Sequence, residues 1–173
     1  MENSQVKITV LINSARQTLV VERDENLLTA LRRASYFSVK YGCEDGTCGV
    51  CTVLLNGKPV RSCKIKAVDV DGAEITTLEG LSQNGKLHPI QEAFVDTGAI
   101  QCGFCTPAQI LTAKALLDKN PSPTDAEIRQ ALNSILCRCT GYVRPVEAVQ
   151  RAAALLRGEA VSPITHLEQP LPE

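Results

Sequence analysis

The chain has 173 residues, which is enough for one ordinary domain or for two small ones. Hydrophobic residues make up 44% of it and charged residues 21%, a balance that excludes a disordered or fibrous protein. The formal net charge of -1 provides no broad attraction for nucleic acid, so we expect no nucleic-acid partner.

The amino-terminal residues lack the basic region and the long apolar stretch of an export signal. No run approaches the roughly 18 apolar residues that are needed to cross a bilayer. We therefore expect a cytoplasmic location and no membrane contact. In that reducing compartment, the eight cysteines are more typical of metal ligands than of disulfide partners.

The first half of the chain is expected to form short strands and one helix. Apolar and β-branched runs predict strands at residues 6–12, 18–21, 52–55, 60–63 and 74–77. The Asn56-Gly57 pair suits a tight hairpin turn, because both residues tolerate positive φ. Asp24 is the expected cap of a short helix, whose apolar positions recur at helical spacing as far as Ala34. A glycine-bearing loop follows at residues 43–51.

The pattern changes to helix after a polar stretch at residues 79–86, where we place the domain boundary. The inward stripe of the first helix is expected to be Leu87, Ile90, Phe94 and Val95. A second helix should begin with Thr106 as its cap, and a third with a capping box formed by Thr124 and Glu127. A fourth should start at Pro145, and its expected inward residues are Val146, Val149, Ala153 and Leu156.

This order of elements predicts an α+β protein. We expect a β-grasp domain over residues 1–80 and an all-α four-helix-bundle domain over residues 81–158. Residues 159–173 contain three prolines and no periodicity, so we expect an extended tail there. The tail is interpreted either as an unstructured end or as an arm that lies along a partner subunit.

Four cysteines of the first half have the spacing of a metal centre. They follow the series C-x4-C-x2-C, and the fourth comes after eleven intervening residues: Cys43, Cys48, Cys51 and Cys63. This opening is the plant-type [2Fe-2S] pattern. Gly42, Gly46 and Gly49 would let the backbone bend close to the cluster and point amide N–H groups at the sulfides. A structural zinc site is the alternative, but zinc ligands are usually paired as two short knuckles.

The other four cysteines lie in the helical half. They form C-x2-C, a gap of thirty-one residues, and then C-x-C: Cys102, Cys105, Cys137 and Cys139. A hairpin of two helices would bring both pairs together at one end. Zinc remains a rival to a cluster here because C-x-C is not diagnostic, whereas disulfide bonding lacks the required compartment.

Three segments together resemble a known family. GCEDGTCGVCTVLLNGKPVRSC, QCGFCTP and LCRCTGY are similar to the iron-sulfur subunit of molybdenum hydroxylases, the xanthine dehydrogenase and aldehyde oxidoreductase family. The likeness spans roughly residues 6–157. It implies a plant-type ferredoxin-like domain followed by a four-helix [2Fe-2S] domain whose cluster is nearer the molybdenum. It therefore favours two [2Fe-2S] clusters and disfavours zinc.

The resemblance also implies roles for individual residues. Gln101 matches a glutamine that hydrogen-bonds the molybdopterin cofactor held by the large subunit, and Cys139 matches the ligand near the pterin amino group. Arg138 is interpreted either as a charge that offsets the cluster or as a plain surface residue. We expect no ligand role for His88 or His166, and we carry no role over to Tyr142 or Pro145.

The implied function is electron transfer inside a hetero-oligomer. Electrons would pass singly from molybdopterin through the two clusters to FAD, on an expected medium subunit, or to another acceptor. This chain carries no motif for hydrolysis, phosphate or dinucleotide binding, so we expect no catalytic residue and no substrate site of its own. Purines, aldehydes, N-heterocycles and carbon monoxide all remain open as substrates of the complex. The alternative is a free-standing two-cluster ferredoxin, which would normally carry a marked acidic face.

Overall fold

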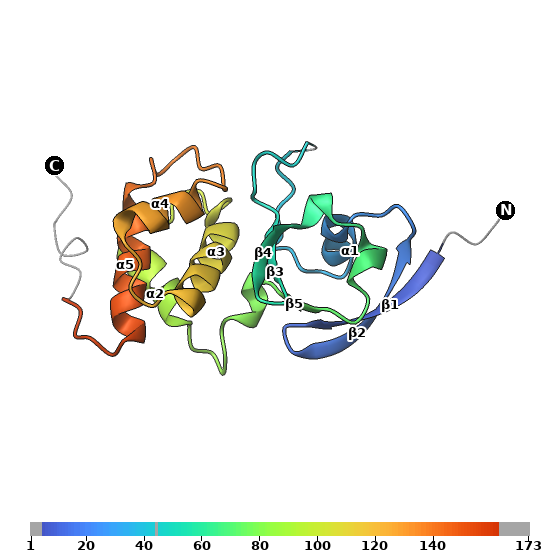
Figure 1. The fold of residues 1–173 in the computed structure, drawn as a ribbon, viewed down its shortest axis with the longest axis horizontal. Coiled ribbons are helices and arrows are strands. Elements are labelled where there is room, and N and C mark those ends of the chain that lie inside the picture. Colours follow the sequence, from blue (N-terminus) through green and yellow to red (C-terminus); the bar gives the residue numbers. More distant parts are fainter. Residues whose placement is uncertain (1–4, 44, 163–173) are drawn as a thin grey trace.

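The computed structural model describes residues 5–43 and 45–162. A mixed sheet and one helix form one half, and four further helices form the other (Figure 1). The strands are β1 (Gln5–Ile12), β2 (Ala15–Glu22), β3 (Thr52–Leu55), β4 (Lys58–Arg61) and β5 (Glu74–Thr76). The helices are α1 (Leu27–Arg33), α2 (Pro89–Asp96), α3 (Thr106–Lys119), α4 (Asp125–Leu132) and α5 (Val143–Leu156). The predicted α+β class is confirmed.

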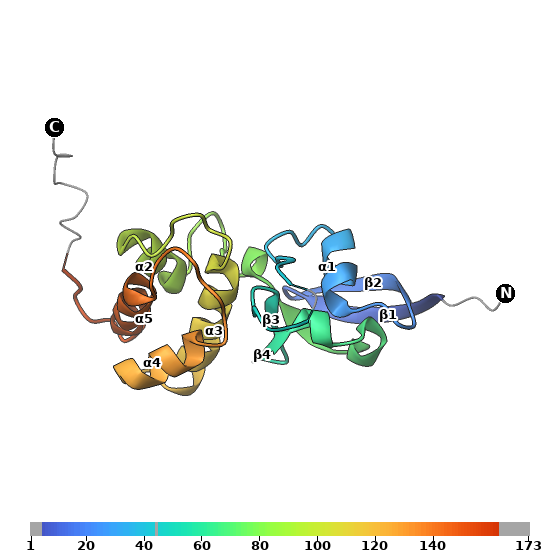
Figure 2. The same ribbon diagram turned by 90° about the horizontal axis from the view of Figure 1, so that it is seen from above.

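The sheet joins two hairpins through its middle strand. Its order is β2-β1-β5-β3-β4, with β5 parallel to β1 and antiparallel to β3. Alternate residues of β1, namely Ile8, Val10 and Ile12, are buried, because successive side chains of a strand point to opposite faces. They pack in one core with the apolar side of α1, which lies along the sheet in Figure 2. The predicted turn at Asn56-Gly57 is confirmed, with φ of 48° and 75°.

Two details of the first half differ from expectation. Asn26, not Asp24, caps α1, since its side chain accepts a hydrogen bond of 2.9 Å from the Thr29 backbone N–H. The return strand ends at Arg61, so Cys63 lies in a short 3-10 turn (Ser62–Lys64) instead of the strand. There the hydroxyl of the fully buried Ser62 donates a hydrogen bond of 2.7 Å to the Cys51 carbonyl. The pairing of β4 with β3 ends at this point.

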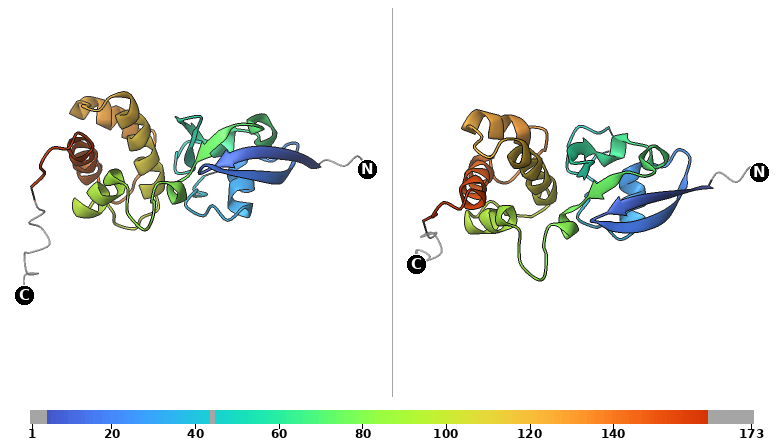
Figure 3. Two further views of the ribbon diagram at one scale, coloured as in Figure 1. Left: turned by 90° about the horizontal axis from the view of Figure 1, so that it is seen from below. Right: turned by 60° about the horizontal axis from the view of Figure 1, so that its bottom comes forward.

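The four helices of the second half enclose one apolar core (Figure 3), with Phe94, Leu111, Ile128 and Val149 among its members. The predicted capping box at α4 is confirmed, because Thr124 and the Glu127 carboxylate exchange hydrogen bonds with each other's backbone N–H.

Other expectations for these helices are wrong in detail. Cys105 rather than Thr106 is the cap of α3, and α5 begins at Val143 rather than at Pro145. The side chain of Val95 is 57% exposed, because the buried stripe of α2 follows Ile90, Ala93 and Phe94 and leaves the next position outside.

Leu87 and Leu156 are also more exposed than predicted. Leu87 is 46% exposed and precedes α2, which begins only at Pro89. Leu156 is 47% exposed at the last position of α5, beyond the buried Ala152 and Ala153.

The two halves meet where α3 packs on β3 and β4, and Leu54 of β3 belongs to the core of the helical half. Of the tail, residues 159–162 form neither helix nor strand, and residues 163–173 lie outside the described part. Among the described residues, no helix is both long and apolar enough to span a membrane.

Candidate iron-sulfur sites

The first cysteine quartet lies at the end of the β3–β4 hairpin. Cys51 directly precedes β3 and Cys63 directly follows Ser62 beyond β4, so the pairing of Thr52 with Arg61 brings them together. Their Sγ atoms are 3.4 Å apart. Cys43 and Cys48, on the loop between α1 and β3, are hydrogen-bonded to each other as a second pair.

Backbone N–H groups point at the sulfur atoms of this loop. The Cys48 N–H and thiol, with the Gly46 N–H, donate to Cys43 and hold the pKa of its thiol below the ordinary value. Burial raises the pKa of Cys48, although the Val50 N–H opposes it. Burial raises the pKa of Cys63 to about 11. Gly46 reaches this geometry at a φ of +83°, which a residue with a Cβ rarely adopts.

The second quartet forms where two inter-helix segments meet. Cys102 and Cys105 stand just before α3, and Cys137 and Cys139 lie between α4 and α5. The Sγ atoms of Cys102 and Cys139 are 3.6 Å apart, and the thiols of Cys105 and Cys137 are hydrogen-bonded. The predicted meeting of the two pairs is therefore present. Cys105 and Cys137 are buried, whereas Cys102 and Cys139 are exposed, so this quartet has an inner and an outer pair.

The surroundings of the inner pair differ for its two thiols. Burial, and then the contact with Cys137, raise the pKa of Cys105 to about 12. Burial alone would raise the pKa of Cys137 as well. Hydrogen bonds from the hydroxyl and N–H of Thr140 and from the Cys139 N–H lower it instead. Cys137 is therefore the thiol of this pair whose ionised form the chain stabilises.

The arrangement of the sulfurs bears on the kind of metal centre. A tetrahedral zinc site needs its ligands around one point, with Zn–S distances of about 2.3 Å. Both quartets instead present two pairs of thiols, and four cysteines hold the two irons of a [2Fe-2S] cluster. The donor set therefore fits a two-iron cluster better than one zinc ion.

A groove of about 320 Å³ runs between the two quartets. It is lined by Gly42, Cys48, Val50, Cys102, Phe104, Cys105, Leu136, Cys137, Arg138 and Cys139. Phe104 is 44% and Leu136 64% exposed at its rim, and Gln101 is exposed beside Cys102. The outer pair of the second quartet is thus surrounded by accessible apolar surface.

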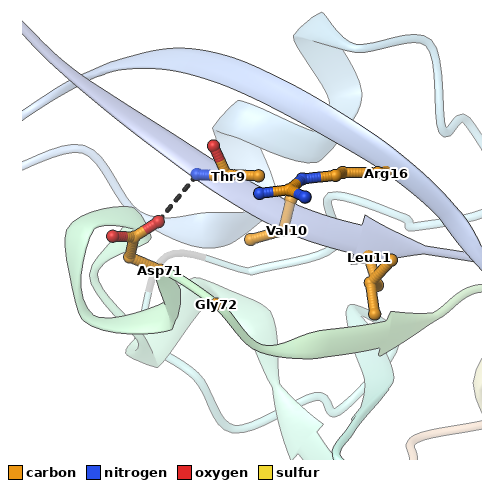
Figure 4. Close-up of a pocket in the computed structure, with 6 residues that line it drawn as sticks. All are labelled: Thr9, Val10, Leu11, Arg16, Asp71 and Gly72. Atoms are coloured by element: carbon orange, nitrogen blue, oxygen red, sulfur yellow. Dashed lines mark hydrogen bonds between the residues drawn. The ribbon is translucent and has the colours of Figure 1, made fainter.

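A separate cavity of about 440 Å³ lies beside the β1–β2 hairpin (Figure 4). Asp71 there accepts a hydrogen bond of 2.7 Å from the Thr9 N–H, and the Gly72 N–H donates to the Thr9 carbonyl at 2.8 Å. These bonds fasten the chain before β5 to β1, and the residues that line this cavity include no cysteine. We assign it a structural role.

Tyr142 is a site residue for which the sequence analysis predicted no role. Its hydroxyl accepts a hydrogen bond of 2.8 Å from the Cys137 N–H and donates one of 3.0 Å to the Ile135 carbonyl. A half-buried tyrosine usually finds a partner for its hydroxyl. Its place three residues after Cys139 was the available signal, but these partners are not visible from spacing.

Comparisons with known proteins match each half of the chain to an iron-sulfur domain. Residues 10–83 match the family described as "2Fe-2S iron-sulfur cluster binding domain", and residues 77–150 match "[2Fe-2S] binding domain". The first quartet lies within the first match and the second quartet within the second. The chain accordingly carries two 2Fe-2S binding domains.

Named relatives identify the family. The chain is 47% identical over 150 residues to the nicotinate dehydrogenase small FeS subunit of Eubacterium barkeri, covering 86% of this chain and 96% of that protein. It is 48% identical over 121 residues to the xanthine dehydrogenase iron-sulfur-binding subunit of Escherichia coli O157:H7, covering 69% and 76%. It covers all of a chain in the crystal structure of quinoline 2-oxidoreductase from Pseudomonas putida 86, with 91% of this chain aligned, 41% identity and a TM-score of 0.85. This chain belongs to the family of iron-sulfur small subunits of the molybdenum hydroxylases, the family of xanthine dehydrogenase and aldehyde oxidoreductase.

Proposed function

We propose that this chain is the electron-transfer subunit of a molybdenum hydroxylase complex and works in the cytoplasm. It passes single electrons from a molybdopterin centre on a large subunit, through two [2Fe-2S] clusters, to FAD or another acceptor on a further subunit. One observation carries the proposal: the loops that bear the two quartets touch. The Leu136 N–H, next to Cys137, donates a hydrogen bond of 2.7 Å to the carbonyl of Cys48.

The two cysteine quartets are the proposed cluster ligands. We assign one cluster to Cys43, Cys48, Cys51 and Cys63, and the other to Cys102, Cys105, Cys137 and Cys139. The paired sulfurs and the surrounding N–H donors support both assignments, because hydrogen bonds to sulfur and solvent exposure set a cluster's potential.

The finer architecture is part of the proposal. Residues 1–80 would form a β-grasp, plant-type ferredoxin-like domain, and residues 81–158 a four-helix-bundle [2Fe-2S] domain. The sheet order and α1 support the first, and the common core of α2 to α5 supports the second. Of the expected extended tail at residues 159–173, residues 163–173 lie outside the described part of the chain.

The face that meets the large subunit would be the one around the outer cysteine pair. Gln101 and Cys139 are assigned to contact the molybdopterin that the large subunit holds. Both are exposed, and the exposed Phe104 and Leu136 beside them offer apolar surface for a permanent contact. An electron would enter at the exposed pair and leave by way of the buried pair.

The chain's own task is to position the quartets relative to each other. Cys105 and Cys137 pack in one buried cluster with Cys48 and Val50, so buried side chains join the two quartets beside the groove. A [2Fe-2S] cluster takes up one electron at a time, so the two electrons of a hydroxylation leave in single steps. Substrate turnover belongs to the partner subunit.

Metal analysis with matched cysteine variants tests this function. The intact complex should contain about four iron atoms and four acid-labile sulfides per copy of this chain, as two [2Fe-2S] clusters require. Cys63→Ser and Cys105→Ser should each remove one of the two paramagnetic signals that dithionite produces and leave the other. Zinc in place of iron would contradict the assignment. Purification of the loaded chain without a molybdenum-containing subunit would favour the free-standing ferredoxin.

A further inference from the structure

Tyr142 has an unusual backbone for a bulky residue. Its φ is 64°, in the left-handed region that residues other than glycine seldom adopt, and it precedes α5 directly. Such a conformation persists only where the surrounding structure holds it in place. Here the hydroxyl of the same residue is engaged twice, by the Cys137 N–H at 2.8 Å and by the Ile135 carbonyl at 3.0 Å.

These two bonds continue into the contact between the quartets. The Ile135 carbonyl and the Leu136 N–H belong to one peptide group. Its oxygen accepts from Tyr142, and its N–H donates to the Cys48 carbonyl at 2.7 Å. An unbroken chain therefore runs from the backbone of Cys137, through the Tyr142 hydroxyl and this peptide group, to the backbone of Cys48. Bonds in such a chain polarise and strengthen one another.

The Ile135–Leu136 peptide group lies among buried residues and close to a neighbouring backbone. Ile135 is fully buried, and Cys48 and Cys137 are 8% and 9% exposed. A Cβ on Gly49 would lie 2.0 Å from the Ser134 carbonyl oxygen, so the two backbones touch without a side chain between them. The Leu136 side chain is 64% exposed, yet its N–H points inward to Cys48.

We propose that Tyr142 is a positioning residue for electron exchange between the two quartets. Its hydroxyl holds the Ile135–Leu136 peptide group against the Cys48 carbonyl and so fixes the contact between the two ligand loops. One electron crosses at a time: one cluster is oxidised by one unit and the other is reduced by one unit, with no bond broken and no proton moved. The inference rests on the proposed function.

The test compares Tyr142→Phe with Tyr36→Phe in the full-length, cluster-loaded chain. Both changes delete a hydroxyl that makes a hydrogen bond, but that of Tyr36 pairs with Gln17 of β2. Iron and sulfide content are measured first, to establish that both clusters are present. Hydrogen exchange of the Leu136 amide is then followed by mass spectrometry. The rate of electron exchange between the clusters is followed by freeze-quench paramagnetic resonance after reduction by less than one electron per chain.

In Tyr142→Phe, the Leu136 amide should exchange about two- to tenfold faster, the effect of losing one supporting hydrogen bond. Electron exchange between the clusters should slow as well, because the contact between the two ligand loops is no longer held in place. Tyr36→Phe should leave both rates unchanged. If Tyr142→Phe matches Tyr36→Phe in both rates while holding two clusters, the inference is wrong and the proposed function stands.

The unaltered chain supplies a second test that does not depend on the variant folding. Its Leu136 amide should be protected from exchange despite the exposed side chain. Exchange as fast as in the urea-unfolded chain would overturn the inference. If the unaltered chain holds no iron and sulfide at all, it is the proposed function that fails.

Discussion

Replacing Gly49 by alanine should drive the two halves of the chain apart at the point where their backbones touch. The added Cβ would lie 2.0 Å from the carbonyl oxygen of Ser134, 3.0 Å from its carbonyl carbon and 3.1 Å from the Cα of Ile135. All three are backbone atoms, so none can swing aside as the end of a flexible side chain would. Either the loop of the first quartet or the segment before Cys137 must move.

Gly57→Ala provides the matched control for the size of this effect. Gly49 and Gly57 have φ of +70° and +75°, so alanine pays the same left-handed penalty of about 1–2 kcal/mol at both. Nothing lies within 4 Å of a Cβ at Gly57. The collision at Gly49 should add about 1–3 kcal/mol, as overpacking does in a close-packed interior. Gly49→Ala should therefore cost about 2–5 kcal/mol, against about 1–2 kcal/mol for Gly57→Ala.

Urea denaturation of the full-length, cluster-loaded chain, followed by circular dichroism, measures both free energies of unfolding under one set of conditions. The entropy that alanine removes from the unfolded chain is the same at both sites, so it cancels from the difference. Gly49→Ala should also accelerate hydrogen exchange of the Leu136 amide, whereas Gly57→Ala should leave that rate unchanged. Equal losses of stability in the two variants, with equal Leu136 exchange, would refute the close contact between Gly49 and Ser134.

The other predictions concern stability. Burial alone would raise the pKa of Glu79, but hydrogen bonds from Ser38 and Thr77 lower it below 4.5; its stabilising effect is therefore full above pH 4.5 and is lost as the pH falls below it. Between pH 6 and pH 4, the thermal stability of Glu79→Gln should fall by less than that of the unaltered chain. An equal fall in both would contradict a stabilising Glu79 carboxylate. Thr124→Ala should cost about 1 kcal/mol in urea denaturation, because it removes the cap of α4, and no loss would deny the capping box. Phe94→Ala should cost about 3–5 kcal/mol and the neighbouring Val95→Ala under about 0.5 kcal/mol; similar values would mean that the buried side of α2 is misplaced.

Much of the architecture is accessible from the sequence because it depends on local patterns. Alternating apolar residues and the Asn56-Gly57 turn place the strands, and the Thr124 capping box places the start of α4. The sequence also predicts that the two cysteine pairs of the second quartet lie close together, because one pair precedes α3 and the other follows α4. The periodicity of apolar residues and the residue preferences of turns are enough to predict these features.

The features that sequence reasoning missed depend on contacts between distant residues. The turn that carries Cys63 exists because Ser62 bonds to the Cys51 carbonyl, eleven positions away. The role of Tyr142 depends on a bond between Leu136 and Cys48, which lie in different halves. The choice of Asn26 over Asp24 as a cap reflects where α1 must begin to bury Leu27, which depends on the sheet beneath it.

A fixed orientation of the two halves favours a wire over a hinged carrier, and the structure contains two contacts that would fix it. At the quartets, the Leu136 N–H donates a hydrogen bond to the carbonyl of Cys48. Beside them, α3 packs on β3 and β4, and Leu54 of β3 is buried in the core of the helical half. A carrier whose halves swung apart would have to break both contacts at each step, whereas a wire needs both intact throughout turnover.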